Sequence, residues 1–391
     1  MPGPSCSMPP RRWAGLLLAL LLPLAACAPQ PLGPRVVLPA PGYAPPVAVP
    51  AQPAIARERV GLLLPLSGGN RALGEAMLNA AQLALFDQQD PRVELLPRDT
   101  GGTPAGAAEA ARAALGEGAR AFAGPLTLGE TAAAAGPARG ARAPLLAFTS
   151  DASQAAPGVW VLGLTPAEQA ERMAEAAAAR GARRFGLLAP DDEFGRRLAA
   201  ALRARLSLAG LPAPVTVLHP PRGDAAAAAQ ELAGLAGPEG LDAVLLGEAG
   251  ERARAAAAAL AAALPRPARL LGTALWLQDR TLAQEPALHG AWFPGPDPAA
   301  RQRFEARYQG AFGERPPRLA GVAYDATALA ARTVRDGFGQ PPVGEAMMGA
   351  DGPIRLLPDG LARRGLAILA VDPSGEPALV EPAPVPPVAG S

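Results

Sequence analysis

The stretch that decides the fold is Arg59-Val-Gly-Leu-Leu-Leu-Pro-Leu-Ser-Gly68, which is followed shortly by Ala72-Leu-Gly-Glu-Ala-Met-Leu-Asn-Ala-Ala-Gln-Leu-Ala-Leu85. The first part contains an apolar run, Val60–Leu64, with the length and character of a strand that is buried on both faces. The second part is rich in Ala and Leu and predicts a helix over Leu73–Asp87. A buried strand that leads through a short loop into a helix is the opening of a β–α–β unit.

The same alternation continues along the chain and predicts parallel sheets with helices on both faces, arranged as two lobes at this length. Further strands are expected at Val93–Leu96, Ala121–Gly124, Pro144–Phe148, Val159–Gly163, Phe185–Ala189, Pro214–Leu218, Ala243–Gly247 and Arg269–Thr273. Helices are expected between them at Ala105–Gly116, Gly129–Ala138, Pro166–Arg180, Glu193–Leu208, Ala225–Leu235 and Glu251–Leu264.

The C-terminal part has a different pattern. Two more helices are expected, at Arg301–Ala311 and Ala320–Gly337. Ile354–Leu357 and Leu366–Val371 are expected to pair as a β-hairpin, because Asp-Gly between them favours a tight turn. The remaining residues, 373–391, are rich in proline and are expected to be disordered.

The N-terminus carries the features of a bacterial export signal. Arg11 and Arg12 precede an apolar run, Trp13–Leu22, which is too short to span a bilayer. Leu24-Ala25-Ala26-Cys27 then places small residues directly before a cysteine and resembles the lipobox of bacterial lipoproteins. That resemblance implies that Cys27 becomes the lipidated N-terminus after removal of residues 1–26, whether the chain starts at Met1 or at Met8. An ordinary cleaved signal that leaves a free cysteine is the alternative.

Composition excludes several classes of protein. The chain has no lysine, so a Walker A loop and Schiff-base chemistry are excluded. The arginines are scattered, which argues against a nucleic-acid-binding surface. His219 and His289 lack the spacing of metal ligands, and Asp191-Asp192-Glu193 is better explained as the start of a helix. We therefore expect a non-catalytic protein without a cofactor or a metal.

Small hydroxyl residues follow three of the strands predicted for the first lobe. Ser67 follows the first strand, Thr127 lies in the Gly124–Thr127 loop, and Thr149 and Ser150 follow Pro144–Phe148. Open α/β sheets bind their ligands at the carboxyl ends of strands, where free N–H groups suit an anion. Each residue also fits an ordinary turn or a helix cap.

These blocks together resemble the type I periplasmic binding proteins, the leucine/isoleucine/valine-binding superfamily, over about residues 57–372. The resemblance rests on the opening strand and helix and on several later blocks: Arg98–Thr103, Gly124–Leu126, Pro144–Ser150, Asp191–Gly195, Ala323–Ala326 and Gly352–Val371. It implies an α/β fold of two lobes, with parallel sheets flanked by helices, a hinge, and a cleft that closes on ligand. Residues 27–56, with nine prolines in Ala28–Ala56, then form a linker between the anchor and this domain.

Amino-acid-binding members of the superfamily hold the ligand carboxylate with hydroxyl and backbone groups of the first lobe, and the amine with an acidic residue of the second. Thr127, Thr149 and Ser150 match the first set, and Glu248 is the candidate for the second. Phe194 stands where the family often has Tyr, and Trp276 either lines the cleft or packs beneath it. Glu248 is also compatible with a helix start.

Within the superfamily, the lipobox, the Pro-rich linker and the Leu-Leu-Pro-Arg-Asp-Thr-Gly-Gly-Thr run (residues 95–103) look most like penicillin-binding protein activators. That resemblance implies a lipoprotein on the periplasmic face of the outer membrane, with a peptidoglycan synthase as partner. Ala28 is not the Asp that is linked to inner-membrane retention. The alternative is a substrate-binding protein of an ABC transporter for amino acids or similar solutes.

The lipid anchor leads to a first prediction. Cys27→Ser is expected to abolish incorporation of labelled palmitate and to release the protein from the membrane fraction, because the acceptor thiol is lost. Cys6→Ser is the matched control, since Cys6 lies in the signal and should leave labelling intact. Labelling that survives in Cys27→Ser would contradict the lipobox.

Overall fold

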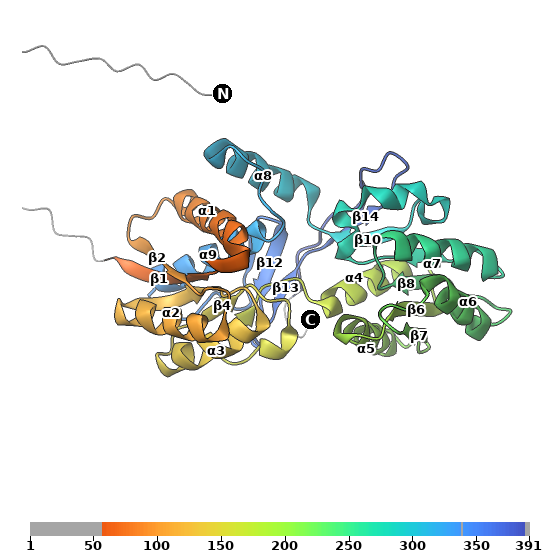
Figure 1. Ribbon diagram of the computed structural model, residues 1–391, viewed down its shortest axis with the longest axis horizontal. Coiled ribbons are helices and arrows are strands. Elements are labelled where there is room, and N and C mark those ends of the chain that lie inside the picture. The colour runs from red at the N-terminus through yellow and green to blue at the C-terminus, as the bar shows by residue number, and fades with distance from the viewer. Residues whose placement is uncertain (1–56, 338, 388–391) are drawn as a thin grey trace, which may run out of the picture. The chain divides into compact units, whose positions relative to one another are not determined.

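The computed structural model describes residues 57–337 and 339–387 (Figure 1). The predicted signal peptide, Cys27 and the linker up to residue 56 lie outside them. Within the described ranges, no helix is both long enough and apolar enough to cross a membrane.

The first lobe is built on a five-stranded parallel sheet in the order β2-β1-β3-β4-β5. Its strands are β1 (Glu58–Leu64), β2 (Val93–Asp99), β3 (Ala119–Ala123), β4 (Leu145–Ala147) and β5 (Val159–Val161). The helices that connect them are α1 (Arg71–Gln88), α2 (Pro104–Gly116) and α3 (Leu128–Gly140). The strands and helices predicted for this region are confirmed, with shifted ends.

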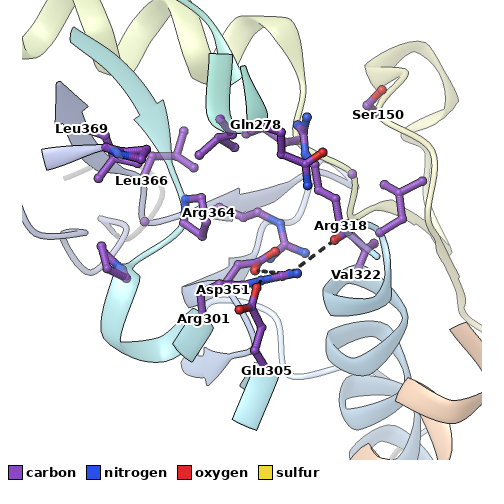
Figure 2. Close-up of a pocket in the computed structure, with 18 of the residues that line it drawn as sticks. Ser150, Gln278, Arg301, Glu305, Arg318, Val322, Asp351, Arg364, Leu366 and Leu369 are labelled. Carbon is purple, nitrogen blue, oxygen red and sulfur yellow. Dashed lines mark hydrogen bonds and ion pairs between the residues drawn. The ribbon is translucent and has the colours of Figure 1, made fainter. Parts of the chain in front are cut away.

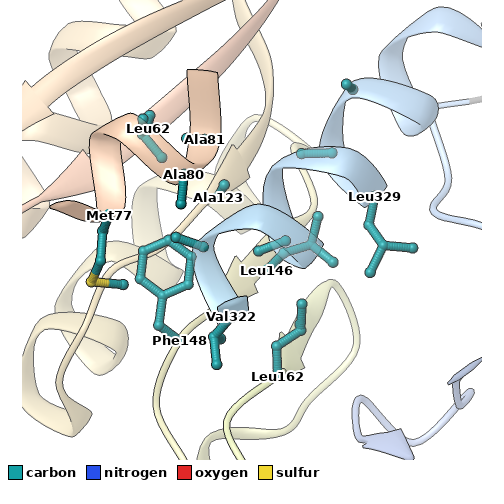
Figure 3. Close-up of a cluster of buried hydrophobic side chains, with 14 of the residues drawn as sticks. Leu62, Met77, Ala80, Ala81, Ala123, Leu146, Phe148, Leu162, Val322 and Leu329 are labelled. Atoms are coloured by element: carbon teal, nitrogen blue, oxygen red, sulfur yellow. The ribbon is translucent and has the colours of Figure 1, made fainter. Parts of the chain in front are cut away.

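The core of the first lobe depends on a helix from much later in the chain. α9 (Ala320–Arg335) is buried on nearly every side, as expected for a helix that is apolar all round. Val322 and Leu329 of α9 belong to one buried cluster with Met77 of α1, Leu146 of β4 and Leu162, which directly follows β5 (Figure 3). On the other face, alanines of α2 and α3 pack against the sheet. The small side chains let these helices approach the strands closely.

The second lobe has a seven-stranded sheet in the order β15-β14-β10-β9-β8-β6-β7. The five strands from β10 to β7 are parallel, and β14 and β15 are antiparallel to their neighbours. The strands are β6 (Phe185–Pro190), β7 (Val215–His219), β8 (Ala243–Leu246), β9 (Arg269–Leu271), β10 (Trp292–Gly295), β14 (Ala367–Ala370) and β15 (Ala378–Glu381). The helices are α4 (Pro166–Ala179), α5 (Glu193–Leu208), α6 (Ala225–Ala236) and α7 (Gly250–Ala263).

Between β1 and β15, the described chain passes between the two lobes three times. The crossovers are residues 162–165 between β5 and α4, 296–297 between β10 and α8 (Pro298–Phe312), and 365–366 between β13 (Ala362–Arg364) and β14. Three short connections of this kind form the hinge region of the two-lobed α/β fold. Both lobes are therefore assembled from segments that lie far apart in the sequence.

The predicted C-terminal hairpin is wrong in its second strand. β12 (Gly352–Leu356) pairs across the Asp359-Gly360 turn with β13, whereas β14, from the predicted Leu366–Val371 strand, joins the second lobe. The four residues of β14 are all buried, so this strand needs a sheet covered on both faces. β13 is short and carries two arginines, which suits the small sheet that β11 (Ala346–Gly349) completes.

The expected disorder over 373–391 is corrected for residues 373–387, while 388–391 lie outside the described residues. β15 lies within this segment and pairs antiparallel with β14 as the edge strand of its sheet. Its Glu381 accepts hydrogen bonds from Arg172 at 2.6 Å and from Arg180 at 3.0 Å. Prolines that flank a short edge strand do not interrupt its hydrogen bonds to the neighbouring strand. The high proline content of this segment therefore did not exclude a strand.

One loop interpretation is confirmed. The Asp192 carboxylate accepts a hydrogen bond from the Gly195 N–H at 2.8 Å and caps α5, as proposed for Asp191-Asp192-Glu193.

Two helical glycines, one packed against a loop and one in open space, provide a test of this packing. A Cβ at Gly74, in the first turns of α1, would overlap the carbonyl oxygen of Pro65 in the loop after β1. We expect Gly74→Ala to lower the free energy of unfolding by about 1–3 kcal/mol, the usual cost of overpacking. Gly234→Ala in α6, where nothing lies within 4 Å, is expected to raise it by up to about 1 kcal/mol, because Gly is a poor helix former. Urea unfolding measures both, and equal effects would contradict the packing described.

Candidate functional site

Two of the predicted hydroxyl residues are used in local structure of the first lobe. The Thr127 hydroxyl accepts a hydrogen bond from the Glu130 N–H at 3.3 Å, and Glu130 accepts from the Thr127 N–H at 3.0 Å. This reciprocal pair is a capping box at the start of α3. Ser67 lies at the entrance of α1, where its N–H donates to Asp99 at 3.2 Å. Neither residue lines the pocket described below.

Thr149 and Ser150 lie next to a direct link between the lobes. Asp151 follows them, and its carboxylate is 2.7 Å from the guanidinium of Arg197 on α5. Partial burial raises the pKa of Asp151, but hydrogen bonds from Arg197 and Ser153 outweigh it, so the net shift is downward. The loop expected to receive a ligand from one lobe is therefore already bonded to the other lobe.

The three residues predicted in the second lobe face its interior. Phe194 is half-buried and packs against the α4–α5 core. The buried Glu248 carboxylate is held by Arg252 at 2.8 Å and lies 2.7 Å from Nε2 of His219. The indole N–H of Trp276 donates to the backbone oxygen of Glu248 at 2.8 Å. Glu248 and Trp276 thus share one internal cluster, apart from the interlobe pocket.

A cavity of about 640 Å³ lies between the lobes and touches all three crossovers. This volume falls within the range for small-molecule sites, about 300–1,000 Å³. Thr149 and Ser150 are the members of the predicted set that line it. Its apolar wall comes from both lobes and comprises Leu126, Phe148, Leu277, Leu319, Val322, Leu366 and Leu369.

Charged side chains gather on one side of this cavity (Figure 2). Arg301 of α8 contacts Glu305 at 2.6 Å and Asp351 at 3.1 Å. Although burial lowers the pKa of Arg301, these carboxylates raise it above its usual value. The charge of Arg301 is thus balanced within the protein. Among the described residues, no three His, Cys, Asp or Glu side chains are grouped as metal ligands.

Arg364 connects the crossovers. Its Nη1 lies 2.7 Å from Asp325 of α9, and its Nε donates to the Leu162 oxygen of the first crossover at 3.1 Å. Its backbone N–H donates to Glu168 at the start of α4 at 3.0 Å. The Asp325 side chain is fully buried and that of Arg364 is 6 % exposed. One residue beside the third crossover is therefore bonded to both lobes.

Sequence reasoning missed the arginines of this site. Every basic residue of the chain is Arg, so Arg301, Arg318 and Arg364 do not stand out from the others. Asp325 did lie in a block that resembles the family, Ala323–Ala326. The position of Arg364 just before β14 was a further signal, because this is where the chain crosses to the second lobe. The predicted hairpin placed β14 in the first lobe and so hid this crossover.

Comparisons with known proteins bear on the fold. The family model described as "Periplasmic binding protein" matches residues 58–350. A putative branched-chain amino acid ABC transporter protein from Rhodospirillum rubrum superposes with a TM-score of 0.71 at 20% identity. That match covers 83% of this chain and 100% of the other. No curated protein sequence matches the chain.

A second kind of protein has the same fold. The C-domain of LpoA from Haemophilus influenzae, described as a regulator of PBP1A, superposes with a TM-score of 0.67 at 19% identity. The match covers 83% of this chain and 100% of that domain. Full-length LpoA from the same organism matches at 18% identity and a TM-score of 0.66, with 83% of this chain and 59% of LpoA covered. The similarity is thus confined to part of LpoA.

The buried ion pair gives a quantitative prediction. Arg364→Met or Asp325→Leu alone is expected to lower the free energy of unfolding by about 3–5 kcal/mol, because each leaves an uncompensated buried charge. The double variant should lose less than the sum of the two. Arg71→Met, in an exposed pair with Glu75, is the control and should cost less than about 1 kcal/mol. Additive losses in urea unfolding would contradict direct coupling of Arg364 and Asp325.

Proposed function

This chain belongs to the periplasmic binding protein family, and we propose that within it the chain is a non-catalytic lipoprotein that regulates a peptidoglycan synthase. The observation that carries the proposal is the Asp151–Arg197 ion pair, which joins the two lobes where an amino-acid ligand was expected. Glu248, the candidate partner for a ligand amine, is held by Arg252 and His219 instead. These contacts leave the predicted amino-acid recognition set without free groups in the second lobe.

The sequence supports the same role. A lipid on Cys27, a Pro-rich linker over 27–56 and an outer-membrane location would let the domain reach a synthase in the periplasm. The fold shared with the LpoA C-domain is consistent with this arrangement. In this proposal, contact with a synthase uses the binding-protein domain or the linker.

A solute-binding role in transport is the second candidate. It is favoured by the interlobe cavity, whose size and mixed lining suit a small molecule. The fold shared with the Rhodospirillum rubrum protein supports the transport role as well as the fold shared with the LpoA C-domain supports the regulatory role. The two candidates differ in their partner: a synthase in the first, an inner-membrane permease in the second.

Reconstitution separates the two. The protein without residues 1–26, added to a purified penicillin-binding protein of the same organism, is expected to increase the rate of glycan polymerisation or cross-linking. The two proteins should also co-purify. Unchanged rates together with no co-purification would refute the regulatory role.

The anchor can be tested in the same system. A version exported behind an ordinary secretory signal, without Cys27, is expected to stimulate the synthase in solution but not to complement a deletion in cells. The reason is that the linker can span the periplasm only from a fixed membrane position. Full complementation by the unanchored version would show that tethering is not needed.

A further inference from the structure

Of the arginines that line the interlobe cavity, Arg318 forms no ion pair within the described residues. Arg301 is paired with Glu305 and Asp351, and Arg364 is paired with Asp325. Among the described residues, no carboxylate lies within ion-pair distance of Arg318. Its Nη1 donates to the backbone oxygen of Ala274, in the second lobe, at 3.3 Å. The other guanidinium donors are left for a ligand or for water.

The surroundings of Arg318 favour an anion. The side chain is exposed to the cavity and lies beside Gln278, as Figure 2 shows. The concave wall still removes part of its hydration, which lowers the pKa of Arg318, and the charge of Arg301 acts in the same direction while Asp351 opposes it. Arginine nevertheless stays protonated in proteins, so Arg318 presents to the cavity a positive charge that no carboxylate contacts directly.

A second donor lies in the same wall. Nη2 of Arg364 is buried and has no hydrogen-bond partner within the described chain. An unpaired buried donor is unfavourable, so a ligand or a bound water that reaches it contributes to binding.

The rest of the lining defines the ligand further. Every carboxylate of the cavity already has an arginine partner: Asp351 and Glu305 pair with Arg301, and Glu376 pairs with Arg280. Asp351 and Glu305 share Arg301, so an ammonium would have to compete with a guanidinium at each of these carboxylates. The apolar wall, which includes Phe148, Leu277 and Leu369, suits a hydrocarbon body.

We infer that this cavity binds a small organic monocarboxylate that carries no amino group, with its carboxylate on Arg318. Because Arg318 stands at the start of α9 and contacts Ala274 of η3 (Ala274–Gln278), the ligand is held between the two lobes. The site is distinct from the set formed by Thr127, Glu248 and Trp276. The inference goes beyond the proposed regulatory function and can hold or fail independently of synthase stimulation.

Matched ligands test the charge requirement. Isothermal titration compares leucine with 4-methylpentanoate, which lacks the amine, and with 3-methylbutylamine, which lacks the carboxylate. Phenylalanine, 3-phenylpropanoate and 2-phenylethylamine repeat the comparison with a larger body. We expect the carboxylates to bind at least tenfold more tightly than the amino acids, and the amines not to bind. Tighter binding of an amino acid, or no carboxylate binding at millimolar concentrations, would overturn the inference.

Variants locate the site. Arg318→Gln is expected to weaken carboxylate binding by roughly 10- to 100-fold, the range for loss of a hydrogen bond to a charged group. Arg318→Lys should retain part of the affinity. The control is Arg303→Gln, an exposed arginine of α8 outside the cavity, which should bind as the wild type does. Circular dichroism and thermal unfolding of Arg318→Gln establish that it folds. Unchanged affinity in folded Arg318→Gln would place the carboxylate elsewhere and refute the assignment.

Discussion

The ion pair between Arg364 and Asp325 is the interaction on which the arrangement of the two lobes depends. Asp325 belongs to α9 in the core of the first lobe, and Arg364 immediately precedes the chain's last passage into the second. Arg364 also donates to Leu162 and Glu168, at the first passage. A buried pair of this kind adds little net stability compared with apolar residues, but it tolerates few alternative geometries. Its contribution is to fix how three separate segments meet.

Some charged side chains around the cavity have an ion-pair partner across the lobes, and Arg318 does not. This difference connects the proposed regulatory function with the proposed carboxylate site. Asp151 and Arg197 satisfy each other across the lobes, which leaves no role for a ligand at that point. Arg318 also contacts the opposite lobe, but only through the neutral backbone oxygen of Ala274. In such a regulator, the Asp151–Arg197 pair would hold the lobes together, and a small acid bound at Arg318 would change their arrangement. The partner protein would then respond to the concentration of that acid. Such coupling requires only that the acid prefer one arrangement of the lobes.

Local patterns in the sequence were sufficient for most of the secondary structure. Apolar runs and Ala-rich stretches identified the parallel strands and their helices, and Asp192 caps α5 as expected. These local patterns did not identify strands whose neighbours in the sheet are distant in the sequence. β10 contains Pro294, which argues against a strand, and β15 is short and flanked by prolines. Of the candidate ligand residues, Thr149 and Ser150 line the cavity, because they follow a correctly identified strand. Arg318 could not be singled out, because its significance comes from the lack of a carboxylate within ion-pair distance among the described residues.

The position of β14 has a consequence for the order in which the protein can be assembled. This strand arrives near the end of the chain and pairs with β10, so one edge of β10 stays unpaired until residues 367–370 are present. The first lobe likewise waits for α9, which follows most of the second lobe in the sequence. A chain synthesised from its N-terminus therefore carries open sheet edges and uncovered apolar faces for most of its synthesis. Unpaired edges of this kind invite association with other chains, so timely chaperoning would matter more here than for a protein with contiguous lobes.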